Sequence, residues 1–213
     1  MNHGYALLNG MNQNISAALA ATLSQILQNP EELKMIEEEL DSELFDGEKP
    51  TLALIKEKLS RDGLKNLDHL SAVIKESLRI SPTIYGKVQV AQKELFVDGF
   101  KISKGTKIFP CSGVIGMSNA VWKEPSKFVP ERYDDTSDWS MTPSGEKRQA
   151  QAWLAFGSGP RACMGDVYTM DHIKVTLIYL LSLYDWQISG AAPTDDHFYF
   201  CTENDFKVTY TRK

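Results

Sequence analysis

Cysteine is scarce in this sequence, and so are runs of one charge or of apolar residues. The 213 residues include only three cysteines, Cys111, Cys163 and Cys201, which lie far apart. They form neither a disulfide framework nor a CxxC metal pair, which favours a reducing, intracellular compartment. The net charge of −5 and the lack of a lysine- or arginine-rich run argue against a nucleic-acid partner.

Long apolar stretches are missing as well. Residues 15–27 are interrupted by polar side chains and are fewer than the ~20 apolar residues that cross a bilayer. The start of the chain lacks the charged, apolar and small-residue pattern of a signal peptide. The sequence therefore predicts a soluble chain without a membrane segment.

Apolar residues recur at helical spacing through most of the first half of the chain. Pro30 suits a helix start, where its missing N–H needs no partner, and Thr51 suits a helix N-cap. The predicted helices cover residues 7–27, 31–44, 51–59, 66–80 and 167–184. Alternating patterns predict strands at 87–97, 100–102, 106–109 and 206–211, with a tight turn at Asp98-Gly99. The expected fold class is mainly α with small β-sheets.

A glycine-flanked loop at residues 156–165 surrounds Cys163 just before the last predicted helix. Glycines let the backbone approach a flat ligand closely, and a helix start offers free N–H groups and a positive dipole end. These features favour the anionic form of Cys163, and cysteine thiolate is one of the few protein groups that ligate haem iron. Arg161 adds a cation that can meet a carboxylate of the ligand.

Three charged residues form a second candidate group. Glu76 and Arg79 are three positions apart, so they share one face of the predicted helix and can pair. A solvated pair of this kind is worth only about 0.3 kcal/mol. If Arg132 from the loop at residues 119–152 joins them, a buried Glu76 between two arginines can lock that loop to the helix.

Together these segments resemble the cytochrome P450 family of haem-thiolate monooxygenases. The cysteine loop matches the family pattern F-x-x-G-x-R-x-C-x-G at Phe156, Gly159, Arg161, Cys163 and Gly165. The family's E-x-x-R helix and P-E-R-F loop are matched in order and spacing by Glu76, Arg79 and residues 130–133, with Tyr133 in place of Phe. The resemblance covers nearly the whole chain, but only the C-terminal half of the family.

The resemblance implies a single partial P450 domain over residues 1–213, with the N-terminal half absent. Its expected segments are a distal-face helix at 1–28, helices including E-x-x-R at 29–80, a β-sheet at 86–110, a meander loop at 111–155, the Cys loop and proximal helix at 156–185, and a β tail at 186–213.

The resemblance also implies a cofactor site. Cys163 would be the axial ligand of the iron of haem b (iron protoporphyrin IX), with Phe156 beside the sulfur and Arg161 at a propionate. Glu76, Arg79 and Arg132 would hold the cysteine loop without taking part in the chemistry. Asn14 would lie near the oxygen on the distal face. The family commonly has a propionate-binding arginine at the position of Gln89.

Residues 67–79 are similar to the branch that contains sterol 7-alpha-hydroxylase and prostacyclin synthase. This implies a monooxygenase that hydroxylates a sterol, terpenoid or other lipid-like substrate with an NADPH-dependent reductase. A full-length member would lie at the endoplasmic reticulum membrane. Residues 12–15 lack the family's acid–threonine pair. One alternative function is therefore that of a haem-thiolate isomerase or lyase. A truncated, non-catalytic paralogue without a stable haem site is the other alternative.

Overall fold

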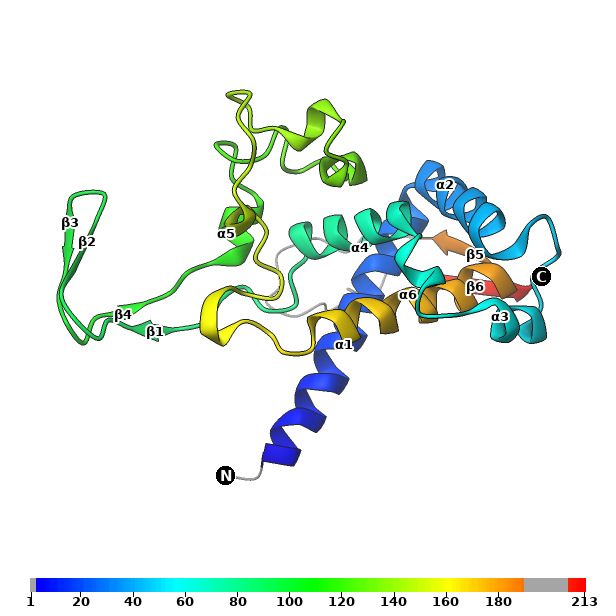
Figure 1. The fold of residues 1–213 in the computed structure, drawn as a ribbon, viewed down its shortest axis with the longest axis horizontal. Coiled ribbons are helices and arrows are strands. Elements are labelled where there is room, and N and C mark those ends of the chain that lie inside the picture. The colour runs from blue at the N-terminus through cyan, green and yellow to red at the C-terminus, as the bar shows by residue number, and fades with distance from the viewer. Residues whose placement is uncertain (1–2, 190–206) are drawn as a thin grey trace.

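The computed structural model describes residues 3–189 and 207–213, and its fold is mainly helical with three small sheets, as the sequence predicted. The helices are α1 (His3–Gln28), α2 (Pro30–Leu40), α3 (Leu52–Lys58), α4 (Asp68–Ile80), α5 (Ser112–Gly116) and α6 (Asp166–Leu183). Helices α4 and α6 both pack against α1 (Figure 1). Within the described ranges, no helix has the length and apolar character that crossing a membrane requires.

Two of the predicted helix starts are confirmed, whereas one predicted helix end is wrong. Pro30 opens α2, and the Thr51 hydroxyl caps α3 by accepting a hydrogen bond from Leu54 N at 3.1 Å. The second helix was expected to run to residue 44, but α2 ends at Leu40 and a π-helical turn, Asp41–Phe45, follows. Both apolar residues of this wider turn, Leu44 and Phe45, are buried in the core.

The three sheets are antiparallel pairs of strands. They are β1 (Gln89–Val90) with β4 (Lys107–Ile108), β2 (Leu95–Val97) with β3 (Phe100–Ile102), and β5 (Tyr184–Ser189) with β6 (Lys207–Arg212). The predicted tight turn is confirmed, because Asp98 and Gly99 both have positive φ values, 48° and 80°.

Two strand predictions need correction. The strand expected at 87–97 is divided between β1 and β2, because β1 pairs with β4 whereas β2 pairs with β3. Strand β5 begins at Tyr184, two residues before the expected β tail at 186–213, where apolar spacing suggested that the last helix continued. Pairing with the distant β6 stabilises β5, and a local pattern cannot reveal such a pairing. Residues 190–206 of the expected β tail lie outside the described residues, as does Cys201.

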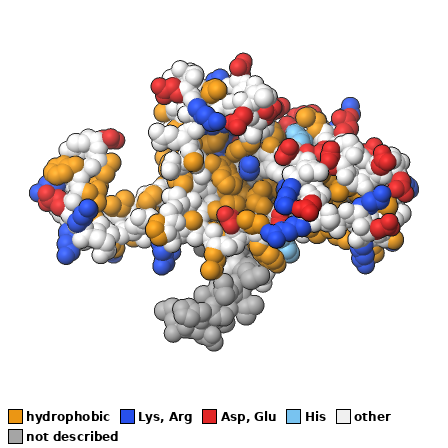
Figure 2. Space-filling model, viewed as in Figure 1, with side chains coloured by type: hydrophobic (Ala, Val, Ile, Leu, Met, Phe, Trp, Pro, Cys, Tyr) orange, Lys and Arg blue, Asp and Glu red, His pale blue; other side chains and the backbone are white. Residues whose placement is uncertain are grey.

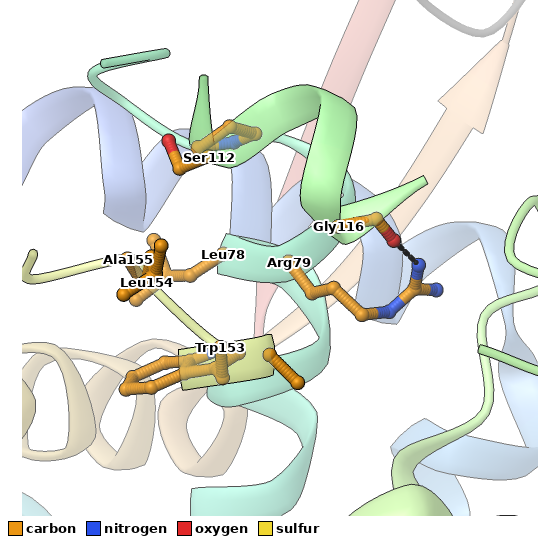
Figure 3. A pocket seen from close by; sticks show the side chains of 9 residues that line it. Leu78, Arg79, Ser112, Gly116, Trp153, Leu154 and Ala155 are labelled. Carbon is orange, nitrogen blue, oxygen red and sulfur yellow. Dashed lines mark hydrogen bonds between the residues drawn. The ribbon is translucent and has the colours of Figure 1, made fainter. Parts of the chain in front are cut away.

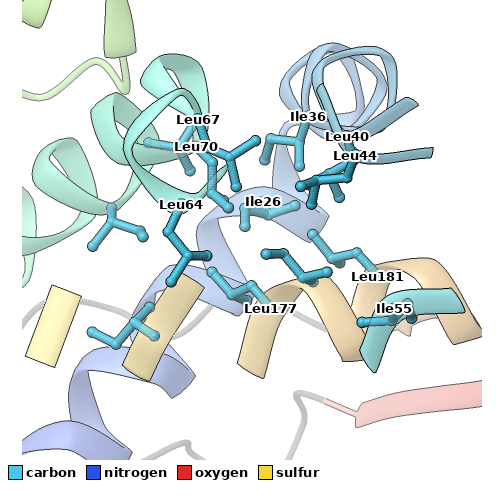
Figure 4. Close-up of a cluster of buried hydrophobic side chains, with 14 of the residues drawn as sticks. Ile26, Ile36, Leu40, Leu44, Ile55, Leu64, Leu67, Leu70, Leu177 and Leu181 are labelled. Atoms are coloured by element: carbon cyan, nitrogen blue, oxygen red, sulfur yellow. The ribbon is translucent and has the colours of Figure 1, made fainter. Parts of the chain in front are cut away.

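The core lies where α1, α2, α4 and α6 meet (Figure 4). Leu70 of α4 and Leu177 of α6 are both fully buried there. Lys174 is also buried, and its ammonium donates a hydrogen bond to the Leu64 carbonyl at 2.6 Å. Burial lowers the pKa of Lys174, because the charged form loses hydration. This core anchors α4 and α6, the two helices that carry the candidate site.

Strands β1 to β4 form an arm that projects from the helices (Figure 1). Phe96 and Phe100 on this arm are 66% and 75% exposed. In the space-filling view, hydrophobic side chains gather along the arm and at the centre of the visible face, whereas charged side chains cover the opposite end (Figure 2).

Replacing Leu177 with Ala should lower the free energy of unfolding by about 2–5 kcal/mol, because it leaves a cavity in the core. The matched control in the same helix is Val167→Ala, since Val167 is 55% exposed and its loss should cost less than about 0.5 kcal/mol. Urea denaturation followed by circular dichroism measures both. Equal losses in the two variants would contradict the packing described above.

Candidate functional site

The cysteine loop at residues 156–165 is folded by its own backbone hydrogen bonds. Gly157 and Gly159 have φ values of 73° and 67°, in the left-handed region that other residues avoid. These turns bring the chain back on itself, so that Cys163 N donates to the Phe156 carbonyl at 2.8 Å. The sequence therefore places its glycines where this loop requires left-handed backbone.

The Cys163 thiol lies at the start of α6 and is exposed. Its sulfur accepts a hydrogen bond from Gly165 N at 3.4 Å, and Gly165 is the N-cap of α6. A hydrogen bond to sulfur and the positive end of a helix dipole both stabilise a thiolate. The arrangement can therefore present an anionic sulfur to a metal.

Across residues 3–189 and 207–213, no cluster of three or more His, Cys, Asp or Glu side chains could hold a metal ion. A metal at Cys163 would therefore need its other ligands from a bound group. Arg161 ends a short 3₁₀ turn, Gly159–Arg161, and its exposed side chain forms no ion pair with the described residues. Its guanidinium is available to an anionic group on such a ligand.

Glu76, Arg79 and Arg132 meet in the interior, and their side chains are fully buried. Arg79 donates to both carboxylate oxygens of Glu76 at 2.8 Å, and Arg132 Nε donates to Oε1 at 2.9 Å. The structure thus brings together the three residues that the sequence singled out. Because Arg132 lies in a 3₁₀ turn, Pro130–Tyr133, the network fastens this turn to α4.

Backbone groups add hydrogen bonds to this network, although Arg132 Nη1 is buried without a partner among the described residues. Val129 N donates to Glu76 Oε1 at 2.9 Å, and Arg79 Nη1 donates to the Gly116 carbonyl at 2.6 Å. Gly116 has no room for a side chain, because a Cβ there would lie 2.6 Å from the Arg79 carbonyl oxygen. Gly116 also lines a small pocket between α4, α5 and the segment that leads into the cysteine loop (Figure 3).

The sequence did not reveal Arg148, a third guanidinium beside this network. It stacks on the Trp122 ring at 4.3 Å and donates to the carbonyls of Trp139 and Arg132. Burial lowers the pKa of Arg132 and of Arg148. Arg148 belongs to no motif and lies in a polar loop, so only the folded backbone shows its role.

Tyr133 ends the turn that carries Arg132, and its hydroxyl donates to the Lys75 carbonyl at 3.2 Å. Burial, with a further contribution from the Glu76 carboxylate, holds the pKa of Tyr133 well above its usual value. The phenol therefore stays protonated in the folded protein at a pH where it ionises in the unfolded chain.

Two sequence-selected residues lie apart from this group. Asn14 is partly buried on α1, and no hydrogen bond joins it to the described residues of the cysteine loop. Gln89 begins β1 on the arm, where it is exposed. The described hydrogen bonds therefore place Asn14 and Gln89 outside both the cysteine loop and the charged network.

Replacing Glu76 with Gln should lower the free energy of unfolding by about 3–5 kcal/mol, because two buried guanidiniums lose their counter-charge. The control is Glu38→Gln, since the Lys34–Glu38 pair has side chains that are 76% and 64% exposed. That change should cost less than about 1 kcal/mol. Chemical denaturation of both variants tests this, and similar losses would contradict the role of Glu76.

Replacing Tyr133 with Phe should make stability less sensitive to alkaline pH. Above pH ~10 the unfolded chain loses the tyrosine proton while the folded chain keeps it, so stability falls as the pH rises. The variant lacks this contribution, and its decline between about pH 9 and 11 should be shallower. Urea denaturation across this range measures the slopes; parallel curves would show that Tyr133 does not contribute.

Comparison with known proteins gives the family of the chain. The model of the cytochrome P450 family matches residues 6–206. Tabersonine 3-oxygenase of Catharanthus roseus is 29% identical over 192 residues, which are 90% of this chain and 36% of that protein. The probable cytochrome P450 12c1, mitochondrial, of Drosophila melanogaster is 31% identical over 212 residues, or 96% and 38% of the two chains.

A third relative, 9-beta-pimara-7,15-diene oxidase of Oryza sativa subsp. japonica, is 28% identical over 193 residues, or 89% of this chain and 35% of that protein. The chain therefore spans about a third of the length of the curated relatives it matches. Since the family model covers nearly all of the sequence, this chain belongs to the cytochrome P450 family.

Proposed function

We propose that this chain is the haem-binding part of a haem-thiolate oxidoreductase, with Cys163 as the axial ligand of the iron of haem b. The observation that carries the proposal is the exposed Cys163 thiol at the start of α6, hydrogen-bonded at sulfur by Gly165 N–H. Haem b is the cofactor of the cytochrome P450 family, to which the chain belongs.

The residues of the cysteine loop fit this cofactor. Gly157 and Gly159 are exposed and lack side chains, so a flat ring can approach the backbone closely. The exposed Arg161 guanidinium suits a propionate, and Phe156 lies partly buried beside the loop. When bound, haem supplies an iron centre whose thiolate ligand favours O–O cleavage. Gly165 N–H donates a hydrogen bond to the sulfur, and the sulfur lies at the start of α6.

The remaining segments are assigned by the same proposal. Helix α1, which carries Asn14, would cover the haem face opposite Cys163, and residues 111–155 would form the meander. Glu76, Arg79 and Arg132 hold this meander against α4 and take no part in the chemistry. Residues 156–185 form the Cys loop and the proximal helix.

The substrate that we infer is a hydrophobic small molecule, hydroxylated with oxygen and with electrons from an NADPH-dependent reductase. Two of the relatives are named as an oxygenase and as an oxidase, and these names support this reaction class. The similarity of residues 67–79 to the sterol 7-alpha-hydroxylase and prostacyclin synthase branch supports a sterol, terpenoid or other lipid. We propose that a full-length protein of this branch is located at the endoplasmic reticulum membrane. The name of the Drosophila relative, which includes the word mitochondrial, supports a mitochondrial location instead.

A haem-thiolate isomerase or lyase is the second candidate. The observation that favours it is the sequence of residues 12–15 on α1, which contains neither a carboxylate nor a threonine. Rearrangements need no proton relay to oxygen. Consumption of NADPH in step with product would exclude this candidate and support the monooxygenase.

The purified chain, loaded with haem, reduced and exposed to carbon monoxide, should show a thiolate-type Soret band. Cys163→Ala should abolish the band because it removes the ligating sulfur. The matched control is Cys111→Ala, since Cys111 is a partly buried thiol at the start of α5. A band that persists in Cys163→Ala would overturn the ligand assignment. A chain that binds no haem would favour the non-catalytic paralogue.

A further inference from the structure

Trp153 lies between helix α4 and the cysteine loop. Its indole N–H donates to the Lys75 carbonyl of α4 at 3.0 Å, and its ring packs partly buried against the core. Trp153 and the two residues that follow it line the small pocket beside Leu78 of α4 (Figure 3). One side of Trp153 is therefore fixed to the helix that also carries Glu76 and Arg79.

The other side of Trp153 contacts the cysteine loop. The ring meets Phe156 edge-on, with centroids 5.7 Å apart and an interplanar angle of 70°. The Phe156 carbonyl in turn accepts the N–H of Cys163 at 2.8 Å. Three successive contacts thus connect α4 with the backbone of Cys163.

The charged network does not make this connection. Glu76 and Arg79 bind the backbone of residues 116, 127 and 129 and the side chain of Arg132, all of which precede the cysteine loop by many residues. Trp153 is the residue through which the segment entering the loop reaches α4 by a side-chain hydrogen bond. The network therefore fixes the meander, and a separate contact fixes the loop.

We propose that Trp153 is a positioning residue for the Cys163 loop, acting through its indole hydrogen bond to the Lys75 carbonyl and its ring contact with Phe156. The proposal rests on the proposed function only in that the loop it positions is the one that would hold haem. Its role is mechanical, because it sets where the loop backbone lies relative to α4.

Tyr133 provides an internal comparison. Its hydroxyl donates to the same Lys75 carbonyl at 3.2 Å, but the residue belongs to the turn that carries Arg132. Its ring meets that of Trp153 edge-on at 6.5 Å and makes no ring contact with Phe156. Loss of the Tyr133 hydroxyl should therefore leave the cysteine loop in place, whereas loss of the Trp153 N–H should loosen it.

The test is amide hydrogen exchange of the full chain by two-dimensional NMR. Trp153→Phe keeps an aromatic ring beside Phe156, but it removes the indole donor and part of the ring volume. The matched control is Trp186→Phe, because Trp186 Nε1 donates to the Leu180 helix carbonyl at 2.9 Å, away from this loop. We expect the Cys163 amide to exchange about five-fold faster in Trp153→Phe, the factor for one lost hydrogen bond. It should be unchanged in Trp186→Phe and Tyr133→Phe.

Equal exchange of the Cys163 amide in Trp153→Phe and wild type would overturn the proposal, and so would an equal acceleration in Trp186→Phe. A second measurement needs no variant: the Trp153 indole N–H of the wild type should be protected from exchange like that of Trp186. An unprotected Trp153 indole would also overturn the proposal.

The outcome is separable from that of the proposed function. Hydrogen exchange is measured without haem. If the chain binds no haem, the proposed function is contradicted, but the exchange result remains valid. If haem binds, Trp153→Phe should lower the fraction of protein with the thiolate-type Soret band relative to Trp186→Phe. Equal fractions would contradict the positioning of Cys163 by Trp153.

Discussion

The structure depends on the pairing of the fully buried Glu76 carboxylate with the guanidinium groups of Arg79 and Arg132. One carboxylate accepts hydrogen bonds from two guanidiniums and from Val129 N–H. A buried charge is costly unless it is paired and fully hydrogen-bonded, and Glu76 meets both conditions. Because its partners come from α4 and from a turn fifty-six positions later, the network fixes a long loop that has little regular structure of its own.

The candidate site is built outward from that point in two stages. The charged network fastens the turn at Arg132, while Trp153 and Phe156 connect α4 with the backbone that leads to Cys163. The thiol then receives its hydrogen bond from the first turn of α6, a helix held by the core at Leu177. The exposed sulfur is thus connected to the interior through the contacts of Trp153 and Phe156 and through the packing of α6.

Local sequence predicted the parts of this design that local chemistry determines. The capped start of α3, the Asp98-Gly99 turn and the glycine-rich loop around Cys163 follow from backbone preferences at single positions. Strand β5 depends on its pairing with β6, and the role of Arg148 depends on how its loop folds over Trp122 and the Arg132 carbonyl. Neither follows from backbone preferences at single positions. The requirement for glycine at Gly116 arises from the Arg79 carbonyl, which leaves no space there for a side chain, and only the folded chain brings these two residues together.

The central claim is that the sulfur of Cys163 binds iron. X-ray absorption at the iron edge of the haem-loaded chain measures the ligands of the metal directly. Ligation by Cys163 should give one sulfur neighbour in the first coordination shell of the iron, which is lost in Cys163→Ala and kept in Cys111→Ala. A first shell of nitrogen and oxygen alone in the unaltered chain would contradict it.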